Sequence, residues 1–185
     1  MIFIVCSAVS VQSCAPVIVA GAATGASVAN DRRTAGTVLE DQSIELKAAN
    51  AIQADSALSK SVHVSVTSFN NIVLVTGQAP TRELRDRVLQ HIHDIEKIRR
   101  IHNEISIDEP TTFKIRSNDT WITTKTKSTL LGAKGLGATH VKVITEGGVV
   151  YLMGLVTHKD GDTAAKTVQQ VTGVQRVVKV FEYLD

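Results

Sequence analysis

The stretch NIVLVTG, residues 71–77, decides the fold because it recurs 77 residues later as GVVYLMG, residues 148–154. Two shorter matches share this offset: HVSV at 63–66 with HVKV at 140–143, and Ile98-x-x-Ile101 with Gln175-x-x-Val178. A fixed repeat period is the signature of duplicated structural units. The sequence therefore predicts two copies of one small module.

The expected module boundaries follow from these matches. The first copy covers residues 41–109 and the second covers residues 118–185, with 110–117 as a linker that contains Pro110 and two threonines. A module of about 68 residues without a disulfide is near the lower limit for independent folding. We therefore expect the two copies to dock and to stabilise each other.

Each copy is predicted to run α-β-β-α-β. An amphipathic helix opens the first copy, because four apolar side chains fall on one helical face: Ile44, Ala48, Ala51 and Ile52. A turn at Asn70-Asn71 joins strands near 62–66 and 72–76, and a helix at 81–96 precedes a last strand at 98–107. The order indicates an α+β fold, with a three-stranded sheet and both helices on one face.

The first residues have the pattern of a secretory leader. A short apolar run from residue 2 to 11 ends at Val-Gln-Ser-Cys, and a Cys after Val-x-Ser resembles the lipobox of bacterial lipoproteins. We expect a signal peptide at 1–13, truncated at its start because no Lys or Arg precedes Ile2, then an acylated Cys14 and a tether at 14–40. Ala15 after the Cys favours the outer membrane. The alternative is a buried N-terminal strand with an unreactive Cys.

Composition excludes several classes of protein. Hydrophobic residues make up 43% of the chain and charged residues 21%, which is enough for a packed core and argues against disorder. The net charge of +2 is too small to indicate a nucleic-acid binder. No run of 18 apolar residues is present, so a transmembrane helix is not expected. Both cysteines lie within the first 14 residues, so the mature chain is expected to have no disulfide.

The repeat resembles the BON domain, a small αββαβ module of Gram-negative envelope proteins. Its marks are a glycine that ends each hairpin, Gly77 and Gly154, and Gly173-Val174 in the last segment. SNDTWITTK at 117–125 and YLMGLVT at 151–157 resemble dual BON-domain outer-membrane lipoproteins. The resemblance implies residence at the periplasmic face of the outer membrane, binding of anionic phospholipid of the phosphatidylglycerol type, and support of envelope integrity. It also implies association with division sites and with the outer-membrane protein assembly machinery.

Local details differ between the copies. The first copy is expected to have Ile44 where the second has Trp121, and Asp41 or Ser43 is expected to cap its first helix. The sequence Asp-Gly-Asp at 160–162 is expected to weaken the second helix of the second copy.

The second copy is the better candidate for lipid contact. It holds 8 Lys or Arg against 6 Asp or Glu, whereas the first copy holds 8 against 10. On a helical projection Ile122, Thr126, Thr129 and Leu130 form the core stripe. The residues expected to contact phospholipid are Trp121, Thr124, Lys125, Lys127, Ser128 and Leu131. The alternative is that Trp121 covers the joint between the two copies.

No motif indicates catalysis, a cofactor or a metal. His91 and His93 point to different helix faces, and Gly132 to Gly137 follows a helix where a phosphate loop would precede one. No G-x-S-x-G is present. We therefore expect a protein that is not an enzyme and that binds neither a small-molecule substrate nor nucleic acid. Two hypotheses remain: a phospholipid-binding envelope protein, and a scaffold that docks the outer-membrane assembly machinery without recognising lipid.

Overall fold

The computed structural model describes residues 31–133 and 135–185. The expected signal peptide and Cys14 lie outside these residues. The first copy contains α2 (Ala35–Ala54), α3 (Leu58–Ser61), β1 (His63–Phe69), β2 (Ile72–Ala79), α4 (Arg82–His93) and β3 (Arg100–Ile107). The second contains α5 (Phe113–Gly132), the 3-10 helix η1 (Ala138–His140), β4 (Val141–Glu146), β5 (Val149–Val156), α6 (His158–Gln169) and β6 (Arg176–Tyr183).

Each copy forms one three-stranded sheet, in the orders β1-β2-β3 and β4-β5-β6. The hairpin strands pair antiparallel, with Val66 opposite Val75, and the last strand pairs parallel to the central one, with Val73 opposite Ile101. The second sheet repeats this register. The expected α+β fold with two tandem modules is confirmed.

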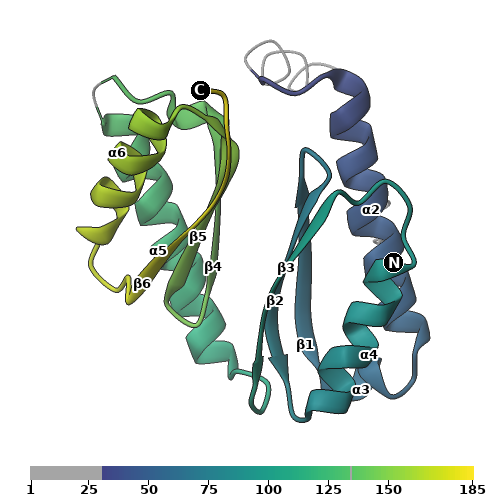
Figure 1. Cartoon of the computed structure of the whole chain (residues 1–185). Coiled ribbons are helices and arrows are strands. Elements are labelled where there is room, and N and C mark those ends of the chain that lie inside the picture. Colours follow the sequence, from purple (N-terminus) through teal and green to yellow (C-terminus); the bar gives the residue numbers. More distant parts are fainter. Residues whose placement is uncertain (1–30, 134) are drawn as a thin grey trace, which may run out of the picture.

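The molecule has four layers (Figure 1). Helices α2 and α4 cover one face of the first sheet, α5 and α6 cover one face of the second, and the two remaining sheet faces lie against each other. Each module has its own apolar core between helices and sheet. A third cluster fills the space between the sheets, and we refer to it as the joint: Phe69, Ile72, Leu74, Tyr151, Met153, Leu155 and Val180.

The joint explains why β2 begins with four apolar residues in a row, Ile72 to Val75, and why β5 is almost entirely apolar. Successive side chains of a strand point to opposite faces, so Val73 and Val75 enter the first module's core while Ile72 and Leu74 enter the joint. Every residue of β2 is buried as a result. A continuous apolar run is typical of strands covered on both faces. The expected docking of the copies therefore takes place sheet against sheet.

Both hairpin turns are held by an aspartate from the first helix of the same module. The Asp41 carboxylate accepts hydrogen bonds from the backbone N–H groups of Asn70 and Asn71, each at 2.8 Å. Asp119 does the same for Gly147 and Gly148, also at 2.8 Å. Both carboxylates are almost completely buried. The expectation that Asp41 or Ser43 caps this helix is wrong, because α2 begins earlier and Thr34 is its N-cap.

The two first helices begin earlier than the sequence indicated. Residues 35–40, expected in the tether, form the start of α2, and residues 113–117, expected in the linker, form the start of α5. Thr112 has extended backbone angles at the N-terminus of α5, and the Arg116 guanidinium donates to the carbonyl of Thr111. The side chains of both helix starts are exposed or half-buried, so they add no core-facing stripe to the sequence pattern, which accounts for the difference.

Three glycines are needed for close packing. A Cβ on Gly77 would lie 2.0 Å from the carbonyl oxygen of His63, and one on Gly154 would lie 2.3 Å from that of His140. Without a side chain at Gly77, the backbone of His63, the first residue of β1, can lie close to β2. Gly154 allows the same approach of His140, just before β4, to β5. Helix α6 includes Gly161, with Thr157 as its N-cap, and the glycine lets α6 approach Phe181.

Candidate lipid-binding face of helix α5

The core stripe of α5 is confirmed. Ile122, Thr126 and Leu130 are at most 1% exposed and pack towards β4 and α6, whereas Thr129 is half-buried. The burial pattern corrects one expectation about the repeat. Ile44, at 2% exposed, is the counterpart of Ile122 and not of Trp121. The helices are therefore offset by 78 residues, as Asp41 and Asp119 also are, and Trp121 corresponds to the exposed Ser43.

The opposite side of α5 exposes large apolar side chains. Phe113 is 78% exposed, Trp121 51% and Leu131 68%. Lys114, Thr124, Lys127 and Ser128 are exposed, and Lys125 is half-buried. All six side chains that the sequence selected therefore lie on α5 at the surface. Phe113 was missed because the sequence placed it in the linker. We refer to this set as the α5 face: Phe113, Lys114, Trp121, Thr124, Lys125, Lys127, Ser128 and Leu131.

Trp121 is held by its own module. The Lys125 ammonium lies 4.8 Å from the centre of the indole ring, a cation–π contact. The ring edge lies beside Gly173, where an added Cβ would be 3.6 Å from Cζ3. Trp121 does not belong to the cluster that forms the joint. The alternative that Trp121 covers the joint is therefore not what the structure shows, since sheet faces fill that place.

Three exposed hydroxyl groups of α5 donate hydrogen bonds to backbone carbonyls of the same helix. Thr120 donates to the carbonyl of Arg116, Thr124 to that of Thr120, and Ser128 to that of Thr124, at 3.0 to 3.1 Å. Moving a hydroxyl group from water into an apolar medium costs less free energy when the group already has a hydrogen-bond partner. These residues can therefore approach an apolar medium at a lower cost than their polarity suggests.

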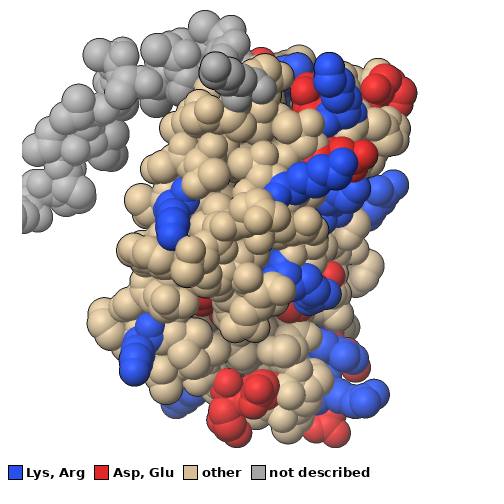
Figure 2. Space-filling model, turned by 90° about the vertical axis from the view of Figure 1, so that its left-hand side faces the viewer, with Lys and Arg blue, Asp and Glu red and all other residues tan. Residues whose placement is uncertain are grey.

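Figure 2 shows the side of the molecule that carries the second copy's helices. Separate Lys and Arg side chains surround a broad uncharged area, while acidic side chains gather at the lower end and along one side. Lys114, Arg116, Lys125 and Lys127 supply four cations to α5, and its only acidic residue, Asp119, is buried. The exposed surface of this helix is therefore apolar and cationic.

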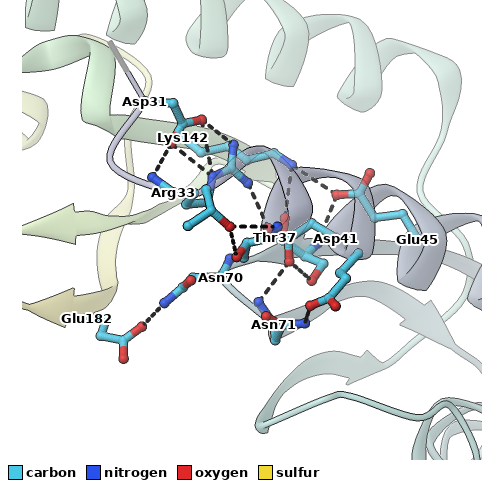
Figure 3. Close-up of polar contacts among 12 residues, drawn as sticks. Asp31, Arg33, Thr37, Asp41, Glu45, Asn70, Asn71, Lys142 and Glu182 are labelled. Atoms are coloured by element: carbon cyan, nitrogen blue, oxygen red, sulfur yellow. Dashed lines mark hydrogen bonds and ion pairs between the residues drawn. The ribbon is translucent and has the colours of Figure 1, made fainter. Parts of the chain in front are cut away.

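A polar network closes the rim of the joint at one end (Figure 3). The Arg33 guanidinium pairs with Asp31 at 2.7 Å and with Asp41 at 2.8 Å, and it stacks 4.0 Å above the ring of Phe69. Across the joint, Lys142 pairs with Glu45 at 2.9 Å. Arg33 thereby fixes the start of the described chain to the first module, and the Lys142–Glu45 pair links the two modules.

A second part of the rim centres on Glu182 of β6. Its carboxylate accepts hydrogen bonds from Asn70 at 2.6 Å and from Arg99 at 2.6 Å. The Arg99 guanidinium lowers the pKa of Glu182 below its ordinary value. Because the first copy supplies Asn70 and Arg99, this ion pair also links the modules.

The described histidines and acids do not gather into a metal site. Within residues 31–133 and 135–185 no group of three His, Cys, Asp or Glu side chains could hold a metal ion. His91 lies 3.0 Å from the carboxylate of Asp55, and together with Arg87 it holds the pKa of that carboxyl well below its usual range. Among the described helices, none combines the length and apolar character needed to cross a membrane.

The family model of the BON domain matches residues 40–109 and 118–185. The chain belongs to the BON-domain family. BON domain 1 and BON domain 2 correspond to the two copies. Outer membrane lipoprotein DolP of Haemophilus influenzae is 36% identical over 174 residues, which cover 94% of this chain and 90% of that protein. The expected assignment to the dual BON-domain outer-membrane lipoproteins is thereby confirmed.

A second relative is the 21 kDa hemolysin of Actinobacillus pleuropneumoniae. It is 37% identical over 154 residues, which cover 83% of this chain and 79% of that protein. Among solved structures, the C-terminal domain of CdsD from the type III secretion system of Chlamydia trachomatis covers 78% of this chain and 67% of that chain. Its identity of 16% and TM-score of 0.31 are too low to support an argument.

Proposed function

We propose that this protein binds anionic phospholipid through the α5 face of BON domain 2 and thereby supports envelope integrity. In this proposal it is held at the periplasmic side of the outer membrane by an acylated Cys14 and acts without catalysis. The observation that carries the proposal is the exposure of Phe113, Trp121 and Leu131 beside lysines on one helix.

The geometry supports contact along the membrane surface. Phe113 and Leu131 are 18 residues apart, which is five full turns, so they lie on the same side of α5 and about 27 Å from each other. Trp121 lies between them, with its ring edge against Gly173 and the rest of the ring exposed. Trp is favoured at membrane interfaces, and each lysine near an anionic surface contributes about 1 kcal/mol.

The names of the relatives agree with a membrane role. One is called an outer membrane lipoprotein and the other a hemolysin. Docking of the outer-membrane assembly machinery belongs to the second hypothesis, in which the protein is a scaffold, whereas enrichment at division sites is part of the proposed localisation. No contact of the described residues favours that hypothesis over lipid binding.

Vesicle flotation tests the proposal. A chain that begins at Asp31 keeps all the described contacts and has no acyl anchor, so its binding to phosphatidylglycerol vesicles reports on the folded modules alone. We expect Trp121→Glu to weaken this binding roughly tenfold or more, equivalent to about 1.4 kcal/mol. The matched control is Ser43→Glu, which adds the same charge at the corresponding exposed position of BON domain 1 and should bind like the parent chain.

The same assay separates the two hypotheses. Binding by the α5 face should weaken when the salt concentration is raised, because exposed charges are screened, and it should be lost with phosphatidylcholine vesicles. A scaffold that does not recognise lipid should fail to float in every case. Equal binding of the Trp121→Glu variant and the parent chain, with an unchanged circular dichroism spectrum, would contradict the proposal.

A further inference from the structure

The turn that joins α6 to β6 lies directly beside the ring of Trp121. We refer to residues 170–175 as the α6–β6 turn. An added Cβ on Gly173 would lie 3.1 Å from Cγ1 of Ile122 and 3.6 Å from Cζ3 of Trp121. The turn is on the outer side of BON domain 2, where α5 and α6 also lie (Figure 1). A bilayer that takes up the exposed part of the indole ring must therefore come close to the turn.

BON domain 1 contains the same turn between α4 and β3, at residues 94–99. The two turns are offset by 76 residues, as are the strands that follow them. Ile98 therefore corresponds to Val174, one residue earlier than the sequence match indicated. Each turn has one residue with a positive φ, Lys97 at 70° and Gly173 at 95°. The first copy thus provides an internal reference for the second.

The two turns differ at every charged position. In BON domain 1 four exposed residues of the turn are charged, and each corresponds to an exposed, uncharged residue in BON domain 2. The charged residues are Asp94, Glu96, Lys97 and Arg99, and their counterparts are Gln170, Thr172, Gly173 and Gln175. The α6–β6 turn therefore has no carboxylate that an anionic surface would repel.

An ion pair closes the corresponding surface of BON domain 1. The Lys97 ammonium lies 2.5 Å from the Glu40 carboxylate, and both side chains border one small cavity with Ser43, the counterpart of Trp121. Both members of this pair are replaced by uncharged residues in BON domain 2, where the indole ring lies against the turn instead. The same place in the fold is ionic in one copy and aromatic in the other.

The conformation of the turn alone does not require a glycine at position 173. Lys97 has a left-handed backbone as well, yet it carries a full side chain. A Cβ on Gly173 would crowd Ile122 at 3.1 Å, which is tighter than ordinary van der Waals contact. The missing side chain therefore lets the backbone of the turn and the indole ring form one continuous surface.

We infer that the α6–β6 turn is a second lipid-contacting element of BON domain 2, which enters the headgroup layer together with Trp121. The amide groups of Gln170 and Gln175 and the Thr172 hydroxyl are exposed, and such groups donate hydrogen bonds to phosphate and ester oxygens. The two carboxylates of the corresponding turn keep BON domain 1 away from an anionic surface. This inference rests on the proposed binding of anionic phospholipid by the α5 face.

A single labelled cysteine tests whether the turn enters the lipid. The chain that begins at Asp31 contains no cysteine, so Thr172→Cys provides a unique site for an environment-sensitive fluorophore. With phosphatidylglycerol vesicles we expect a blue shift of the fluorophore, together with a blue shift of Trp121, the only Trp of the chain. The matched control is Glu96→Cys at the same position of BON domain 1, whose label should report water with and without vesicles.

Restoring the carboxylates of the first copy tests why the turn is neutral. Gln170→Asp combined with Thr172→Glu should weaken flotation with phosphatidylglycerol vesicles roughly tenfold or more, because two negative charges then approach an anionic surface. The first copy holds both acidic residues in the same turn, so the fold should accommodate them and the urea midpoint should hardly move. The control is Ser43→Glu combined with Asn50→Asp, which adds two carboxylates to the exposed side of α2 and should float like the parent chain.

Each outcome supports or overturns the inference. A label at position 172 that stays in water while the Trp121 emission shifts overturns it and leaves the proposed function standing. Equal flotation of the double acidic variant and the parent chain also overturns it, as does a label at position 96 that shifts as much as the label at 172. If the parent chain neither floats nor shifts its Trp121 emission, the proposed function fails and the inference fails with it.

Discussion

Replacing Asp41 or Asp119 by alanine should destabilise the protein by unequal amounts. Asp119 accepts two backbone hydrogen bonds at 2.8 Å in a nearly buried site. A hydrogen bond to a charged group contributes about 1.5–3 kcal/mol, so Asp119→Ala should lower the free energy of unfolding by about 3 kcal/mol. Asp41 additionally accepts from the Ser68 hydroxyl at 2.6 Å and pairs with Arg33. We expect Asp41→Ala to cost about 5 kcal/mol.

Urea denaturation followed by circular dichroism measures both losses. Losses of this size are a large fraction of the 5–15 kcal/mol that stabilises a typical domain, so the midpoints should be well resolved. The control is Asp86→Ala, which removes an exposed carboxylate that pairs only with its neighbour Arg85 and should change stability by less than about 0.5 kcal/mol. If Asp41→Ala costs no more than Asp119→Ala, the reasoning from the contacts is refuted.

Two further predictions concern backbone packing and pH. Gly77→Ala should destabilise by about 3 kcal/mol or more, because its Cβ would overlap the carbonyl of His63, whereas Gly132→Ala, with nothing within 4 Å, should be nearly neutral in the same urea assay. Burial in the joint raises the pKa of Tyr151 to about 12, with the Glu104 carboxylate adding to the effect. Since the folded pKa exceeds the ordinary value near 10, the stability that Tyr151 contributes is present below about pH 10 and is lost as the pH rises towards 12. Phenolate absorbance should show this late titration, and Tyr151→Phe should remove it; a midpoint near 10 would contradict it.

The repeat made most of the fold predictable from the sequence. The strand matches at an offset of 77 located the strands of both sheets. The helices could not be aligned in the same way, because α5 is rich in Thr and Lys and its apolar periodicity is weak. Asp41 and Asp119, both polar and both buried, reveal the true offset of 78, but only once their contacts with the hairpin turns are known.

The joint and part of the α5 face were harder to predict from the sequence. The uninterrupted apolar runs of β2 and β5 did carry a signal for strands covered on both sides, yet a sequence does not show what provides the second cover. Phe113 was missed because Pro110 and two threonines indicated a linker, whereas α5 starts directly after them. The exposed residues from Trp121 to Leu131 could be found because a helix projection separates them from Ile122 and Leu130.

The four layers have a consequence for how this protein meets its surroundings. Helices α2 and α5 form opposite outer surfaces, with two sheets between them (Figure 1). A flat bilayer that touches α5 therefore cannot touch α2, whose exposed Leu39 and Leu46 then face away from it. In the proposed function the two outer surfaces therefore have different roles. Helix α5 meets the lipid, and helix α2 stays accessible to a partner on the side away from the membrane.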